Sequence, residues 1–159
     1  MPTASTEEIP LGPLHIRFLI DGTAEPAAHR SLSLFEFSVA PGARVPIAHS
    51  HDAYDETLYG LDGTLTMTLW SSSGEPARTA LGPGDVLFIP RGAVHRFDNF
   101  SADAPARILA VITPGILGAA YFREIGALVA AAMAAKAPPD PVAVAQIMLR
   151  HGLTPAPGR

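Results

Sequence analysis

Hydrophobic and polar positions alternate most clearly between Thr64 and Trp70, where Leu65, Met67 and Leu69 fall on one face and threonines on the other. Successive residues of a β-strand point to opposite faces of the sheet, so this alternation predicts a strand with one buried face. Apolar runs bounded by glycine, proline and serine predict further strands. These runs cover residues 14–20, 32–39, 78–81, 86–89 and 107–112, and another strand begins near Val94.

Short strands at regular spacing, with turn residues between them, indicate a β-barrel or β-sandwich. The pattern changes after Pro114. Residues 117–136 are rich in alanine and leucine and predict a helix. Asp140 and Pro141 are suited to the N-cap and first turn of a second helix, which ends near His151-Gly152. We therefore predict a frayed N-terminal tail over residues 1–8, a β-domain over residues 9–114 and a helical extension over residues 115–159.

The first predicted helix is apolar over more than one face, so it needs packing partners. Its large apolar side chains are Leu117, Tyr121, Ile125, Leu128, Val129 and Met133. Three arrangements satisfy this pattern: an interface in a homodimer, a lid over the mouth of the β-domain, or packing on the outside of the same subunit. We expect a homodimer, and the pattern alone does not choose among the three.

Composition excludes several classes of protein. With 159 residues the chain is long enough for one core, and 48% of its residues are hydrophobic. A net charge of −4 and a single lysine, Lys136, provide no basic patch for a nucleic acid. The absence of cysteine excludes disulfides and thiolate metal sites. The longest apolar segment, residues 125–135, is too short to span a membrane, and no signal-peptide pattern opens the chain. We expect a cytoplasmic protein that binds neither nucleic acid nor membrane.

The candidate chemistry is a set of three histidines and one glutamate. His49 and His51 lie on one face of a predicted strand, about 7 Å apart. Glu56 follows a turn-prone segment and opens the next apolar run, and His95 follows the turn signal Pro90-Arg91-Gly92. Any one histidine alone is more often an ordinary core or surface residue, but the four together predict a metal site. Imidazoles and a carboxylate suit one divalent transition metal (iron, manganese, nickel, cobalt or zinc) and suit calcium poorly.

These residues resemble the two motifs of the cupin family, in particular those of single-domain, quercetin-dioxygenase-like cupins. The first motif is matched by Gly42, His49, His51, Glu56 and Gly63, although Gly42 is one residue further from the first histidine than is common. The second motif is matched by Gly84, Pro90, Gly92, His95 and Asn99. The motifs cover residues 42–99, and the flanking strands extend the resemblance to about 31–113. It implies a mainly β fold, a cupin double-stranded β-helix or jelly-roll barrel, here with a C-terminal helical hairpin.

The resemblance also implies a three-histidine, one-glutamate metal site at the barrel mouth and a small oxygen-bearing substrate. In dioxygenase members of the family the glutamate can be both ligand and proton acceptor, so Glu56 is the candidate base; the alternative is that it only binds the metal. Tyr54, close to the ligand loop, is a candidate hydrogen-bond donor to substrate; the alternative is a simply half-buried tyrosine.

A mostly apolar and aromatic pocket wall favours an aromatic or apolar substrate over a sugar. The candidate wall residues are Phe35, Phe37, Arg44, Met67, Phe97 and Asn99. Three functions remain open. We favour a dioxygenase-type oxidoreductase acting on a small phenolic, diketone or enolisable molecule. The alternatives are an oxygen-independent, metal-dependent isomerase, lyase or decarboxylase, and a non-catalytic small-molecule-binding protein.

Overall fold

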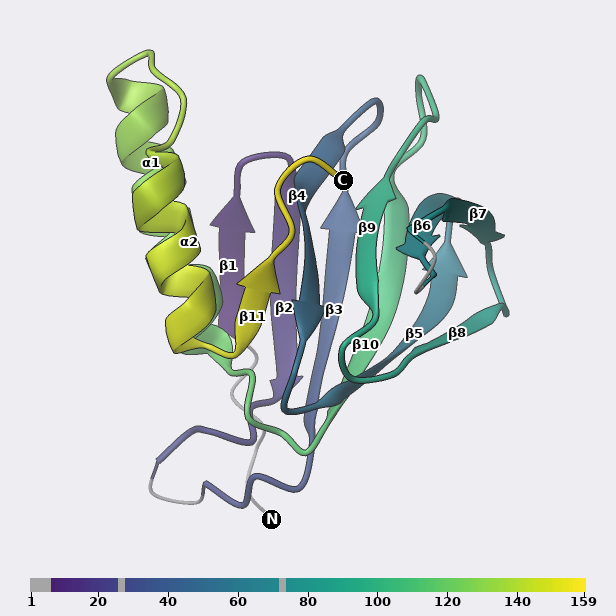
Figure 1. The fold of residues 1–159 in the computed structure, drawn as a ribbon, viewed down its shortest axis with the longest axis horizontal. Coiled ribbons are helices and arrows are strands. Elements are labelled where there is room, and N and C mark those ends of the chain that lie inside the picture. The colour runs from purple at the N-terminus through teal and green to yellow at the C-terminus, as the bar shows by residue number, and fades with distance from the viewer. Residues whose placement is uncertain (1–6, 26–27, 72–73) are drawn as a thin grey trace.

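Two antiparallel β-sheets and a pair of helices make up the computed structural model, which describes residues 7–25, 28–71 and 74–159 (Figure 1). One sheet has six strands in the order β1-β2-β3-β10-β5-β8, and the other has five in the order β11-β4-β9-β6-β7. Buried side chains from both sheets form one hydrophobic core. The fold is therefore the mainly β, two-sheet barrel that the sequence predicts, with two helices following it.

The elements lie close to their predicted positions. The six-stranded sheet contains β1 (Glu7–Leu11), β2 (Leu14–Ile20), β3 (Ser33–Val39), β5 (Asp55–Asp62), β8 (Val86–Ile89) and β10 (Ala106–Thr113). The five-stranded sheet contains β4 (Arg44–His51), β6 (Leu65–Trp70), β7 (Pro76–Leu81), β9 (Val94–Asp98) and β11 (Leu153–Pro155). The helices are α1 (Ala119–Ala134) and α2 (Pro141–Arg150).

Alternation of side chains gives the strands their buried faces. Along β3 every second residue from Ser33 to Val39 is buried, and the residues between them are half-buried. On β6, Leu65 and Met67 are fully buried, as the alternation predicts. Each strand thus turns one row of side chains toward the space between the sheets.

Two strands were not expected from the sequence. Glu7 and Glu8, expected in the frayed tail, open β1, where they pair with Phe18 and Arg17; residues 1–6 lie outside the described residues. The signal for β1 is weak because its five residues include two glutamates and Pro10, which a sheet tolerates mainly at its edge. In the predicted helical extension, Leu153–Pro155 forms β11, which pairs with the histidine-bearing β4.

The short apolar run Val86–Ile89 is a strand that is buried on one face only: Ile89 is fully buried, but Val86 and Phe88 are exposed. Val86 is 64% exposed and Phe88 is 57% exposed, because β8 is the last strand of its sheet and one face of it has no covering layer. Tyr59 lies on the neighbouring strand β5 and pairs with Val86, and it is also exposed.

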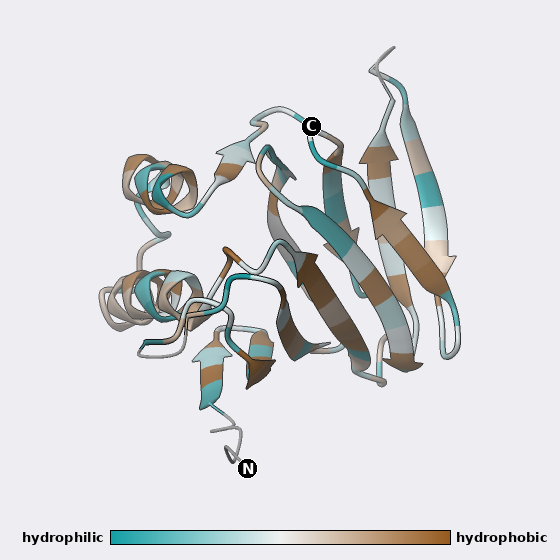
Figure 2. Cartoon of the chain, turned by 90° about the horizontal axis from the view of Figure 1, so that it is seen from below, coloured by the Kyte–Doolittle hydropathy of each residue, from teal (hydrophilic) through white to brown (hydrophobic). Residues whose placement is uncertain are grey.

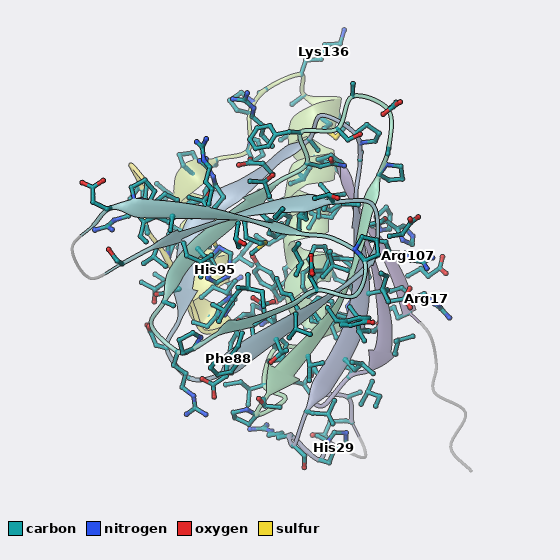
Figure 3. All side chains as sticks on the ribbon, turned by 90° about the vertical axis from the view of Figure 1, so that its right-hand side faces the viewer. Arg17, His29, Phe88, His95, Arg107 and Lys136 are labelled. Carbon is teal, nitrogen blue, oxygen red and sulfur yellow. The ribbon has the colours of Figure 1, made fainter. Side chains whose placement is uncertain are left out.

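The two helices lie side by side at one side of the sheets (Figures 1 and 2). α1 packs against β1 and α2 packs against β11. Since β1 and β11 are edge strands of different sheets, the helical pair bridges the two sheets at that side. Lys136, expected at the helix end, follows the end of α1 and extends into solvent (Figure 3).

The apolar face of α1 is used within its own subunit. Leu117, just before α1, and Ile125 are buried in the core, and three more of the predicted side chains pack against it: Tyr121, Leu128 and Val129. Met133 alone of the six is largely exposed. The described part of the chain contains no helix with the length and apolar character needed to cross a membrane.

Candidate metal centre

Three histidines from two neighbouring strands meet in the interior. His49 and His51 lie on β4, and His49 pairs directly with His95 on β9. The three residues are buried, and their candidate ligand atoms all lie within 4.8 Å of one another. Figure 3 shows His95 inside the protein, far from the solvent-exposed Lys136. This separation of nitrogen atoms allows all three imidazoles to bind one ion.

Backbone carbonyl groups orient two of the rings. Nδ1 of His49 lies 3.0 Å from the carbonyl oxygen of Ile47, and Nδ1 of His95 lies 3.0 Å from that of Ala93. Each carbonyl belongs to the residue two positions earlier in the chain. A proton on Nδ1 donates to this carbonyl and leaves the lone pair of Nε2 free for a metal.

Glu56 reaches the cluster from the opposite sheet. It lies on β5 between Ile112 of β10 and Ile89 of β8. Its Oε2 atom is 3.4 Å from Nε2 of His95 and 3.9 Å from Nδ1 of His51. The structure thus brings all four predicted ligands together, with the carboxylate beside two of the three histidines.

The two histidine-bearing segments are tied to each other by hydrogen bonds. The amide of Gly92 donates to the carbonyl oxygen of His51 over 2.8 Å. The amide and guanidinium of Arg91 both donate to the Asp55 carboxylate, next to Glu56 in the chain. Gly92 adopts φ +77°, a conformation that glycine reaches without steric strain. The turn before His95 is therefore fixed against the end of β4 and the start of β5, which carry the other ligands.

Burial favours the neutral form of two of the histidines, His49 and His51. Loss of solvent, reinforced by the neighbouring His95 and His51, lowers the pKa of His49 to about 3. Loss of solvent also lowers the pKa of His51 to about 4, although Glu56 opposes this shift. Burial alone would raise the pKa of Glu56, but its interaction with His95, and then those with His51 and His49, outweigh burial and lower this pKa to about 2.

At neutral pH His49 and His51 are therefore neutral and Glu56 is ionised. These are the protonation states in which nitrogen and oxygen side chains bind metals. The donor set fits a divalent transition metal, as the sequence predicts, and it contains no sulfur.

Tyr54 is fully buried and stacks on His51, with ring centroids 4.4 Å apart and planes inclined by 22°. Its hydroxyl has no hydrogen-bond partner among the described residues, and burial raises its pKa. Tyr54 does not line the cavity at the site. The ring thus contacts a predicted metal ligand, and the alternative of a half-buried tyrosine is wrong because Tyr54 is fully buried.

A cavity of about 290 Å³ opens beside the histidines and extends to the helices. Its wall includes the predicted Phe35, Phe37 and Phe97 as well as the four metal-site residues. Other wall residues come from β1, β2, β4, β11, α1, α2 and their connections: Leu11, Pro13, Leu14, Ile16, Ile47, Leu117, Tyr121, Phe122, Ile125, Val129, Pro139, Val144 and Leu153.

Three predicted wall residues lie elsewhere. Arg44, at the other end of β4 from the histidines, is exposed and sits over the ring of Phe100. Met67 is buried in the core opposite Phe97, because Leu69 rather than Met67 pairs with His95.

Asn99 lies just beyond the end of β9, where side chains no longer alternate between the two faces of a strand. Its amide donates to the carbonyls of Val39 and Ala104, and its side-chain oxygen accepts from the amide of Ser101. This buried side chain therefore braces a loop and does not line the cavity.

The helical part of the wall was not assigned from the sequence. Leu117, Tyr121, Ile125 and Val129 recur every fourth residue, which places them on one side of α1 and its N-terminal approach. That spacing is the signal that could have identified them, but it does not say which surface the helix covers.

Known proteins resemble the central part of this chain. A family model described as the cupin domain matches residues 35–112. Germin-like protein subfamily 2 member 1 of Arabidopsis thaliana is 33% identical over 96 residues, covering 57% of this chain and 43% of that protein. Quercetin 2,3-dioxygenase of Bacillus subtilis is 33% identical over 82 residues, covering 50% of this chain and 21% of that protein. The matched segment thus spans less than half of each relative.

Solved structures share the fold. An oxalate decarboxylase from Lactobacillus farciminis superposes with a TM-score of 0.60 at 22% identity, over 71% of this chain and 32% of that one. A sugar phosphate isomerase of the cupin superfamily from Silicibacter pomeroyi superposes with a TM-score of 0.54 at 25% identity, over 69% and 71%. The two-sheet barrel, the histidine cluster and the matched domain define a cupin. The chain belongs to the cupin superfamily.

Proposed function

We propose that this protein is a metal-dependent cupin enzyme of the dioxygenase type, acting on a small phenolic, diketone or otherwise enolisable substrate. The observation that carries the proposal is the buried cluster of three histidines beside an ionised glutamate, at the wall of an apolar cavity. A mostly apolar cavity next to a set of metal ligands is a common arrangement for catalysis.

The residues that would hold the metal are His49, His51, His95 and Glu56. A divalent transition metal bound there supplies Lewis acidity toward substrate oxygen and, if it is redox-active, access to oxygen chemistry. The protein positions the reactants: the carbonyls of Ile47 and Ala93 fix two of the rings, and the mostly apolar wall offers water few hydrogen-bond partners.

Glu56 is the proposed proton acceptor. Its carboxylate is ionised at neutral pH, and it is the one carboxylate on the cavity wall among the described residues. An enolisable substrate with an oxygen near the histidines would present its acidic proton to this side of the cavity. Tyr54 lies behind His51, away from the cavity, so we propose that it positions His51 and does not itself contact substrate.

An oxygen-independent isomerase, lyase or decarboxylase is the second candidate, because the superposed structures include a decarboxylase and an isomerase. The wall favours the first proposal. It contains neither lysine nor arginine, so the described residues provide no cation for a phosphate or a second carboxylate. A non-catalytic small-molecule-binding protein is the third candidate, and it differs in showing ligand binding without turnover.

Oxygen consumption tests the proposal. Protein loaded separately with iron, nickel or manganese is mixed with flavonols and diketones in an oxygen-electrode cell. At least one metal form is expected to consume oxygen in the presence of substrate, and Glu56→Ala is expected to lose that activity. Glu8→Ala, which changes an exposed glutamate on β1, is the matched control. Product formation without oxygen uptake would support the second candidate instead.

A homodimer is the proposed assembly, and cytoplasmic localisation stays a prediction. Because α1 buries its apolar face in its own subunit, we place the contact on the exposed face of the β5–β8 edge. Tyr59, Val86 and Phe88 gather there, and an edge strand offers free backbone groups to a second copy.

A further inference from the structure

The cavity wall has two chemically different parts. One part is formed by the three histidines and Glu56. The rest of the wall is almost entirely apolar and includes residues of β1, β2 and the helices, among them Leu11, Leu14, Ile125, Val129 and Val144. Apart from the four metal-site residues, Tyr121 is the only residue on the wall with a polar side-chain atom among those the structure describes.

Such a wall discriminates between polar and apolar ligands, because burying a polar group against it is unfavourable. A hydroxyl or phosphate placed against Ile125 or Val144 would lose water without gaining a hydrogen bond, which is unfavourable in an apolar environment. An apolar group placed there gains by leaving water. A cavity of about 290 Å³ is at the small end of the range for ligand sites, so it suits a molecule with one ring or a short chain beyond its reactive head.

We infer that the substrate is an uncharged molecule with a compact oxygen-bearing head at the histidine cluster and an apolar tail between the barrel and the helices, and that Val144 of α2 sets the space for the tail. This inference rests on the proposed function only in assigning the head to the metal site. It makes the C-terminal helices part of the substrate pocket and excludes sugar phosphates and small dicarboxylates.

Val144 offers a well-controlled test. It lies on the cavity wall and packs against the core, whereas Val142, two residues earlier on the same helix, is 62% exposed. The same substitution can therefore be made at a wall position and at a solvent position of α2. Val144→Phe fills space in the apolar part of the cavity, and Val144→Thr introduces a hydroxyl with little change in volume.

Binding is measured by isothermal titration calorimetry on protein loaded with Zn²⁺, which has no redox chemistry. The probes are acetylacetone, benzoylacetone and dibenzoylmethane, which share one head and differ in apolar groups, together with oxalate and fructose 6-phosphate. Benzoylacetone is expected to bind about tenfold or more tightly than acetylacetone, because a phenyl ring replaces a methyl group against the apolar wall. Oxalate and fructose 6-phosphate are expected to bind more weakly than benzoylacetone.

Val144→Phe is expected to weaken the binding of benzoylacetone and dibenzoylmethane and to leave the affinity for acetylacetone unchanged. Val142→Phe is expected to bind all three diketones as the wild type does. If Val144→Phe does not fold, Val144→Thr and Val142→Thr give the same comparison. Val144→Thr is then expected to lose affinity for benzoylacetone several-fold, and Val142→Thr is expected to keep it. Equal affinities for the three diketones, tighter binding of oxalate or fructose 6-phosphate, or equal effects at 142 and 144 would overturn the inference. Selective binding without oxygen uptake by any metal form would instead leave it intact and refute the proposed oxidation.

Discussion

His49 and His95 pair directly across β4 and β9, with their ring centroids 4.6 Å apart. Both rings are buried, and each places Nδ1 against the carbonyl oxygen of the residue two positions earlier in the chain. The same local geometry on neighbouring strands thus turns two imidazoles toward one another. Protonating both would place two positive charges side by side without water, so the pair is suited to a cation supplied from outside.

The metal-free protein is expected to lose stability as the pH falls below 6.5. His49 and His51 have pKa values lowered to about 3 and about 4 in the folded state, so between pH 6.5 and these values the unfolded chain binds more protons than the folded chain. Unfolding is therefore favoured as the pH falls, by up to about 2.7 kcal/mol per pH unit where two protons are involved. Urea unfolding of chelator-treated protein at pH 7, 6 and 5 measures the slope.

The His49→Gln, His51→Gln double variant is the comparison for that slope, because it removes both titrating rings. Its free energy of unfolding should depend less steeply on pH than that of the wild type. Identical slopes would show that these two histidines do not titrate as their burial requires.

Tyr54 is predicted to act through its ring. Tyr54→Phe keeps the stacking on His51 and removes a buried hydroxyl that has no partner among the described residues, so stability should stay within about 1 kcal/mol of the wild type. Tyr54→Ala should cost about 3–5 kcal/mol and weaken metal binding. Chemical denaturation and metal titration measure both effects. A large loss of oxygen uptake in Tyr54→Phe, with normal metal content, would instead indicate direct contact with substrate.

Asn99 is predicted to stabilise the fold without shaping the cavity. Asn99→Ala removes two donated hydrogen bonds and one accepted hydrogen bond in a fully buried position, which should cost about 2–4 kcal/mol. Metal content and diketone affinity of the folded variant should match the wild type, because Asn99 is not on the wall. Reduced affinity at full metal loading would place it in the site after all.

The proposed homodimer depends on the exposed β8 edge. Phe88→Asp puts a charge in the middle of the apolar face formed with Tyr59 and Val86, and it should convert a dimer to a monomer in light-scattering chromatography. Val142→Asp changes an exposed valine on α2 and should leave the mass unchanged. A wild-type monomer at high concentration would contradict the assembly.

The sequence predicted the barrel strands and the meeting of the three histidines well because both depend on local spacing. Alternation fixes which face of β4 carries His49 and His51, and the turn ending at Gly92 fixes where β9 and His95 begin. Glu56 could be assigned for the same reason, since it opens β5 directly after the ligand loop. These relationships need only short segments of chain and the resemblance to the cupin motifs.

The pocket wall was harder to predict because it is made by contacts between distant segments. Arg44 and Asn99 lie near the ligands in sequence, but one is at the far end of its strand and the other is beyond the strand end. Val144 and Leu11 are distant in sequence, yet they line the same cavity as the histidines. Their contribution depends on how the helices pack against β1 and β11, and hydrophobic periodicity does not determine that packing.

Metal content tests the central claim most directly. Protein is purified without added metal, equilibrated with a small excess of Co²⁺ or Zn²⁺ and desalted. Its metal content is then measured by elemental mass spectrometry. The wild type and the exposed-site control His15→Ala should each carry about one ion per chain. The His49→Ala, His51→Ala double variant should carry almost none while keeping the wild-type circular dichroism spectrum. Equal metal content in the folded double variant and the wild type would contradict the account.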